Sequence, residues 1–150
     1  MLLSQSLENE AGDEDMLPIT LTMAGAAVLL HIWLALRCSM VRIRQKVAVG
    51  DGGNPSMLAR MRAHANFMEN TPLFLILLGL IEMADGSARW LWGAGIAFIL
   101  ARISHAFGMD RPSPNPLRSG GMLVTLIALL VLAIAAIRLA YQAGQPVVIG

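Results

Sequence analysis

Three polar side chains recur along one stretch of the chain at the spacing of a helical stripe. Arg62, Asn66 and Glu69 lie at positions i, i+4 and i+7, which places a guanidinium, an amide and a carboxylate along one face of a helix. Such a stripe can hold a polar ligand through charge-assisted hydrogen bonds. The uncharged run 71–81 follows directly, so the sequence predicts one helix that is half polar site and half membrane span.

Polar residues also stand at the ends of the other apolar segments. Arg102 and His105 lie about one helical turn apart near the end of the third segment. Arg118 and Ser119 open the fourth, where the positive end of a helix dipole favours anion binding. Because the second and third helices are expected to run in opposite directions, Arg102 is predicted to meet Glu69 as a buried ion pair. Such a pair can be purely structural.

The chemistry that this set supports is the binding of a small polyanion. The cluster comprises Arg42, Arg62, Asn66, Glu69, Arg102, His105, Arg118 and Ser119. Arginines bind carboxylates bidentately, and the one carboxylate of the cluster can hold an ammonium group. The predicted pocket is therefore net positive and has a single anionic contact.

The chain excludes several other chemistries. Cys38 is the single cysteine, so there is no intrachain disulfide or CxxC pair, and any thiol chemistry needs a thiol from a bound molecule. His31, His64 and His105 fall on three different predicted helices without HxxxH or HExxH spacing, so no metal site is predicted. The sequence also lacks a phosphate-binding glycine loop and a nucleophile elbow.

The elements that must position the cluster are membrane spans. Of the 150 residues 56% are hydrophobic and only 14% are charged, which is typical of a membrane protein rather than a soluble domain. Four all-α spans are predicted at 17–36, 57–83, 90–109 and 120–141 within one domain, residues 17–150. Spans two and three carry ionisable groups that cost about 2.5 kcal/mol each at the bilayer centre. We therefore expect these groups to face a polar interior.

The distribution of charge predicts the orientation in the membrane. Residues 1–16 hold five acidic and no basic residues, so they lack the positive region of a secretory signal and are expected to form a disordered acidic leader. Basic residues gather after the first and third spans, and such residues mark the cytoplasmic side. Both termini are thus predicted outside, with the polar cluster facing the cytoplasm.

Four short motifs resemble those of one membrane family, in the same order along the chain. RAHANFMENTPLFL, residues 62–75, is similar to the second-helix signature of the MAPEG family, the membrane-associated proteins in eicosanoid and glutathione metabolism. VRIRQK at 41–46 resembles the basic end of the family's first helix, RISHAFGM its third, and PLRSGG the start of its fourth. The resemblance covers about residues 17–142.

The resemblance implies a homotrimer of four-helix bundles that holds glutathione between neighbouring subunits. The residues it assigns to glutathione binding are Arg42, Arg62, Asn66, Glu69, His105 and Ser119. It assigns stabilisation of the thiolate to Arg118, and pairing with Glu69 to Arg102. Met109 stands where the prostaglandin synthase branch has a tyrosine, which disfavours the eicosanoid synthase activities. The short loops and compact length look more like the bacterial glutathione-transferase-like members, in the inner membrane.

Three functions are compatible with these residues. The first is an enzyme that conjugates glutathione to lipophilic electrophiles in detoxification, or acts as a peroxidase on lipid hydroperoxides. The second is a non-catalytic membrane protein that binds glutathione or lipid. The third is a small transporter, which the position of the polar residues at one depth disfavours.

The orientation can be tested by labelling single cysteines. In a Cys38→Ser background, Asp85→Cys should react with an impermeant thiol reagent applied to intact cells, and Asn54→Cys should react only after the membrane is opened, because the basic connection lies inside. Reaction of the Asn54→Cys protein from outside would show the opposite orientation.

Overall fold

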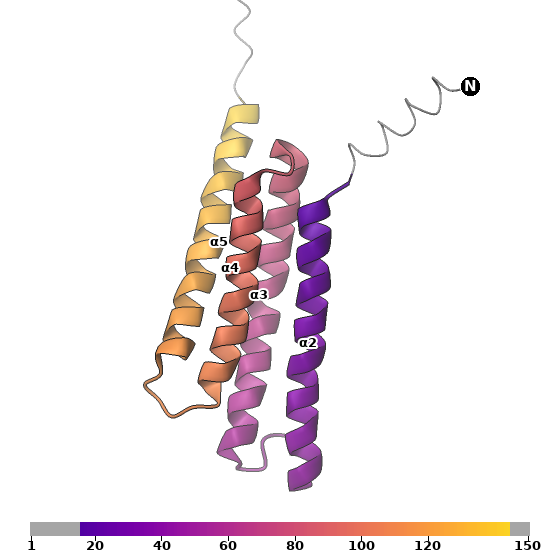
Figure 1. Cartoon of the computed structure of the whole chain (residues 1–150), viewed down its shortest axis with the longest axis vertical. Helices are drawn as coiled ribbons and strands as arrows, with labels where there is room; N and C mark the ends of the chain where they lie inside the picture. The colour runs from indigo at the N-terminus through magenta and orange to yellow at the C-terminus, as the bar shows by residue number, and fades with distance from the viewer. Residues whose placement is uncertain (1–15, 145–150) are drawn as a thin grey trace, which may run out of the picture.

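The computed structural model describes residues 16–144, which form antiparallel helices joined by short connections (Figure 1). The helices are α2 (Pro18–Gln45), α3 (Pro55–Asp85), α4 (Arg89–Met109) and α5 (Pro116–Ala143). No strand occurs within residues 16–144. The predicted all-α architecture with four spans is confirmed, whereas the predicted acidic leader lies outside the described residues except for Met16.

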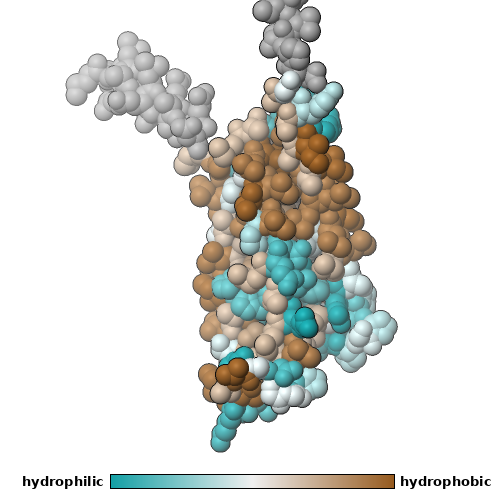
Figure 2. Space-filling view, turned by 180° about the vertical axis from the view of Figure 1, so that it is seen from behind, coloured by the Kyte–Doolittle hydropathy of each residue, from teal (hydrophilic) through white to brown (hydrophobic). Residues whose placement is uncertain are grey.

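All four helices are long and apolar enough to cross a membrane. Large apolar side chains remain exposed along each of them, for example Leu29, Ile76, Leu100 and Leu130. Figure 2 shows this as a continuous hydrophobic band over the upper half of one face. An apolar surface of this kind would promote aggregation in water, but it is the surface that hydrocarbon solvates well.

The helices extend beyond the predicted spans. The first runs to Gln45 rather than residue 36, because residues 37–45 contain no glycine or proline. The last begins at Pro116 rather than residue 120, since proline is well suited to the first helical position and Asn115 caps it. Hydropathy marks the part of a helix that lies in lipid, so it missed the polar turns at these ends.

The start of α2 is capped by a carboxylate from the far end of α3. Buried Glu82 accepts hydrogen bonds from the backbone amides of Ile19 at 2.9 Å and Thr20 at 2.8 Å, and from the hydroxyl of Ser87 at 2.8 Å. Two free amides of the first turn are thereby satisfied, and the negative charge lies at the positive end of the helix dipole. Glu82 therefore joins α2 to the α3–α4 turn.

The interior holds two apolar layers. Phe74 and Phe98 stack with their ring centroids 3.9 Å apart in the layer that lies near the Glu82 end. The second layer, built around Leu34, Phe67 and Ala106, lies toward the opposite end of the bundle. Asn66 and His105 of the predicted polar cluster adjoin Phe67 and Ala106 of this second layer along the chain.

Helices α4 and α5 touch backbone to backbone. A Cβ added to Gly108 would lie 2.3 Å from the backbone nitrogen of Arg118, and one added to Gly121 would lie 2.5 Å from the carbonyl oxygen of Ala101. No side chain fits at either position. The two glycines thus fix the first turns of α5 against the last turns of α4, as small residues do in packed membrane helices.

Replacing Gly108 should separate these helices. Gly108→Ala should lower the free energy of unfolding by about 1–3 kcal/mol, because the new methyl group meets backbone that cannot move aside. Gly93→Ala in the same helix is the matched control, since nothing lies within 4 Å of its Cβ. Denaturant unfolding of the detergent-solubilised protein, followed by circular dichroism, measures both. Equal unfolding midpoints for the two variants would contradict the close contact.

Candidate functional site

A cleft of ≈ 640 Å³ lies between α3, the end of α4, the loop after it and the start of α5. It is lined by Arg62, Ala65, Asn66, Glu69, His105, Met109, Ser113, Pro114, Asn115, Arg118, Ser119 and Met122. Every residue predicted to bind or activate the ligand is among them except Arg42. On the face shown in Figure 2, hydrophilic side chains gather below the hydrophobic band.

One wall of the cleft is the predicted stripe of α3. Arg62, Asn66 and Glu69 all line it, as their helical spacing requires. Arg62 and Glu69 are exposed in the single chain, whereas Asn66 is half-buried. Neither charged side chain forms an ion pair within residues 16–144. A guanidinium and a carboxylate are thus both available at this wall.

The predicted ion pair between Arg102 and Glu69 is not formed in this chain. Arg102 is 1% exposed and donates instead to the amide oxygen of Asn66 and to the hydroxyl of Thr125, the latter at 3.0 Å. Thr125 in turn donates to the carbonyl oxygen of Gly121 at 2.8 Å. The guanidinium lies deeper in the bundle than the exposed carboxylate of Glu69, so neutral acceptors from α3 and α5 solvate it. The sequence missed Thr125, because a single threonine in an apolar span carries no signal.

The opposite wall is the beginning of α5. The side chain of Asn115 accepts from the amide of Leu117 at 3.0 Å and caps the helix. Nδ1 of His105 lies 3.0 Å from the carbonyl oxygen of Arg118, and the hydroxyl of Ser104 donates to the carbonyl oxygen of Leu117 at 3.2 Å. Two side chains of α4 therefore hold the turn that carries Arg118.

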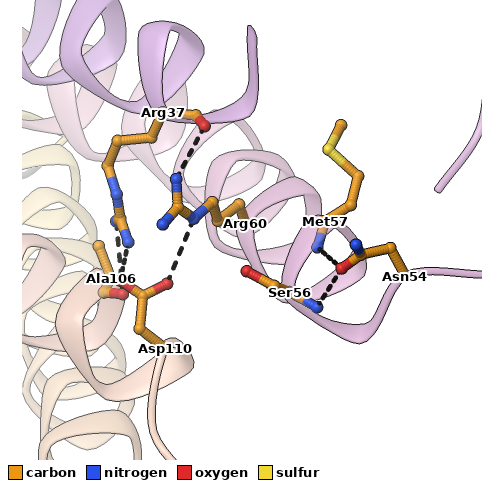
Figure 3. A network of polar contacts seen from close by, with 7 residues as sticks. All are labelled: Arg37, Asn54, Ser56, Met57, Arg60, Ala106 and Asp110. Carbon is orange, nitrogen blue, oxygen red and sulfur yellow. Dashed lines mark hydrogen bonds and ion pairs between the residues drawn. The ribbon is translucent and has the colours of Figure 1, made fainter. Parts of the chain in front are cut away.

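The loop that closes the cleft is anchored by Asp110. Its carboxylate pairs with Arg37, and its Oδ1 lies 3.7 Å from Nε of Arg60 (Figure 3). The guanidinium of Arg37 also lies 4.6 Å from the ring centroid of Trp33, and Arg60 donates to the carbonyl oxygen of Arg37 at 3.1 Å. Asp110 thus connects α2, α3 and α4 just where the loop to Ser113 and Pro114 begins. No sequence pattern pointed to this network, because its members are far apart along the chain.

The histidines of α2 and α3 lie next to each other. Nε2 of His64 is 3.0 Å from Nδ1 of His31, and the ring centroids are 4.8 Å apart. Among the described residues no group of three or more His, Cys, Asp or Glu side chains could hold a metal ion. The pair satisfies its facing nitrogens by mutual hydrogen bonding.

Comparison with known proteins identifies the family. The model of the MAPEG family matches residues 20–138, which include most of all four helices and the whole cleft. The chain belongs to the MAPEG family.

Two relatives of this MAPEG chain are the inner membrane proteins YecN of two Escherichia coli strains. YecN of strain K12 is 32% identical over 96 residues, which are 63% of this chain and 72% of YecN. YecN of strain O6:H1 gives the same values. Family membership and four long apolar helices make this chain an integral membrane protein, as predicted.

Arg42 is the one expected ligand residue of this MAPEG chain that lies apart from the cleft. Its guanidinium donates to the carbonyl oxygens of Val47 at 3.4 Å and Ala48 at 3.1 Å, and so closes the turn after α2. Within the described residues no Cα atom of α2 lies within 8 Å of one of α5. In the single chain Arg42 does not line the cleft.

Removing the carboxylate of Asp110 should destabilise this MAPEG fold. Asp110→Asn leaves the buried guanidinium of Arg37 without its counter-charge, and we expect a loss of about 2–3 kcal/mol. The loss stays below the upper values for fully buried pairs, since the Asp110 side chain is 33% exposed. Denaturant unfolding in detergent measures it.

Asp51→Asn is the matched control, because Asp51 lies in a connection and forms no ion pair within the part of the chain that the structure describes. Adding Arg37→Met to Asp110→Asn should restore part of the stability, because the unpaired charge is then gone. If the Asp110→Asn protein were as stable as the Asp51→Asn protein, Asp110 would not anchor the fold.

Proposed function

We propose that this MAPEG protein is a glutathione-dependent membrane enzyme. It ionises the thiol of glutathione and transfers the thiolate to a lipophilic electrophile, or uses it to reduce a lipid hydroperoxide. The observation that carries the proposal is the presence of two arginines, Arg62 and Arg118, and one carboxylate, Glu69, in a single cleft beside the apolar bundle. Family membership supports it, since the family includes glutathione transferases and peroxidases.

The charges of the cleft complement those of glutathione. The tripeptide carries two carboxylates, one ammonium and one thiol, and the carboxylates suit the guanidinium of Arg62 and the amide of Asn66. Glu69 is the carboxylate available for the ammonium. Cys38 does not line the cleft, so the reacting sulfur comes from the ligand.

Arg118 is the residue assigned to the thiolate. A free thiol has a pKa of about 8.5 and is only a few per cent ionised at neutral pH. Lowering that pKa by about 1.5 units requires roughly 2 kcal/mol of differential stabilisation. A guanidinium in the first turn of α5, beside the positive end of the helix, is suited to supply it.

The remaining lining of the cleft suits an apolar second substrate. Ala65, Met109 and Met122 present apolar surface beside the charged groups, and methionine adapts to ligands of different shape. Met109 offers no hydroxyl, which favours general conjugation or peroxide reduction over the prostaglandin synthase chemistry of the tyrosine-bearing branch.

Assembly as a homotrimer would complete the site. Arg62 and Glu69 are exposed on the single chain, and charged side chains of membrane helices normally face protein or water rather than lipid. A neighbouring subunit covering α3 removes this cost and can bring its own Arg42 to the cleft. The cleft then faces the cytoplasm, where glutathione is present.

Substitution of Arg118 tests the proposed chemistry. Arg118→Ala should lower conjugation of a halonitroarene by about 10²–10³-fold, because the stabilisation of the thiolate is lost, while glutathione binding weakens only modestly. Arg118→Lys should recover part of the rate, since the charge remains. Ultraviolet difference spectra against pH measure the ionisation of the bound thiol.

Arg44→Ala is the control, because Arg44 is also exposed and cationic but lies outside the cleft. If the bound thiol ionises at the same pH in the wild-type and Arg118→Ala proteins, Arg118 does not activate it. Binding of glutathione without turnover in the wild type would instead favour the non-catalytic alternative.

A further inference from the structure

The hydrogen bond between His105 and Arg118 determines which nitrogen of the imidazole carries the proton. Nδ1 of His105 lies 3.0 Å from the carbonyl oxygen of Arg118, and a carbonyl oxygen can only accept. Nδ1 must therefore be protonated. In the neutral ring Nε2 is then an unprotonated acceptor, directed away from the α5 backbone.

The lone pair of Nε2 is available in the cleft. His105 lines the cleft, and its Nε2 has no hydrogen-bond partner among the described residues. Nε2 is also absent from the buried polar atoms that lack a partner, which are those of Thr20, Arg60 and Arg102. Nε2 of this largely buried imidazole is therefore accessible and has no partner among the described residues.

The amide and the hydroxyl of the cleft are poorly suited to take a proton. The amide oxygen of Asn66 already accepts from Arg102, and amides and hydroxyls such as those of Asn66 and Ser119 are very weak bases. The carboxylate of Glu69 is paired with the ammonium of the ligand in the proposed binding mode. The charged groups around the imidazole are Arg62 and Glu69 of α3, Arg102 of α4 and Arg118 of α5.

We propose that Nε2 of His105 is the general base that takes the proton of the glutathione thiol. This inference rests on the proposed function, in which Arg118 stabilises the thiolate but, as a permanent cation, cannot accept a proton. Because Nδ1 of the imidazole is bonded to the backbone carbonyl of Arg118, the base lies next to the residue that carries the guanidinium. His105 and Arg118 thus divide the task between proton removal and charge stabilisation.

When a halonitroarene is the second substrate, the S–H bond of glutathione breaks, its electron pair stays on sulfur, and a new N–H bond forms at Nε2. The thiolate attacks the ring carbon, a C–S bond forms, and the halide leaves with the electron pair of its own bond. The imidazolium then releases its proton to water at the mouth of the cleft.

The His105→Asn substitution separates the proposed role of His105 as a base from its structural hydrogen bond to the carbonyl of Arg118. The amide N–H₂ of asparagine can replace Nδ1–H in the bond to the Arg118 carbonyl, but nothing replaces Nε2. Stopped-flow ultraviolet absorbance after mixing with glutathione follows thiolate formation, and equilibrium titration gives the affinity. We expect thiolate formation to slow by about 10²–10⁴-fold with affinity within about threefold of wild type. The residual rate should rise with imidazole buffer concentration, since an external base then takes the proton.

The outcomes separate the two proposals. A wild-type protein that forms no thiolate with glutathione overturns the proposed function. A wild-type protein that forms thiolate, together with a His105→Asn protein that forms it equally fast, overturns only the role of His105. If the His105→Asn protein does not assemble, the wild type alone decides. A rate of thiolate formation that is independent of buffer concentration supports an internal base. A rate that increases with the concentration of buffer base refutes the proposed role of His105.

Discussion

The backbone contact between α4 and α5 is the constraint on which the cleft depends. Gly108 and Gly121 let the two helices approach until no Cβ fits between them. This approach brings the carbonyl of Arg118 within reach of His105 and that of Leu117 within reach of Ser104. The first turn of α5 is thereby held in position. The side chain of Arg118 therefore projects from a rigid backbone, as preorganised sites require.

Five arginines at this end of the bundle fall into two groups. Arg37, Arg60 and Arg102 are bonded to the protein itself, through Asp110, backbone carbonyls, Asn66 and Thr125. Those that line the cleft, Arg62 and Arg118, form no ion pair within the described residues. A buried guanidinium requires partners because its desolvation is costly. The exposed ones can therefore serve a ligand without loss to the fold.

Two deep polar contacts also orient the groups that face the cleft. Arg102 holds the amide oxygen of Asn66, so the donor end of that amide remains for a ligand. The Arg118 carbonyl holds Nδ1 of His105, so the acceptor end of the imidazole remains. In both cases a contact inside the protein decides which hydrogen-bonding character the side chain presents, as is usual for second-layer contacts around functional sites.

The sequence by itself determined the four membrane helices and half of the residues that line the cleft. Hydropathy and helical spacing are local properties, so they located the spans, placed Arg62, Asn66 and Glu69 on one stripe, and marked His105, Arg118 and Ser119 at the ends of the other spans. Resemblance to the MAPEG family added the roles in glutathione binding and thiolate stabilisation. Only the tertiary structure decided the partners: Asn66 and Thr125 rather than Glu69 for Arg102, Asp110 for Arg37, and a turn outside the cleft for Arg42. The partners of Arg102 and Arg37 depend on the depth of each side chain and on which helices are neighbours, and both are properties of the packed bundle that no local pattern encodes.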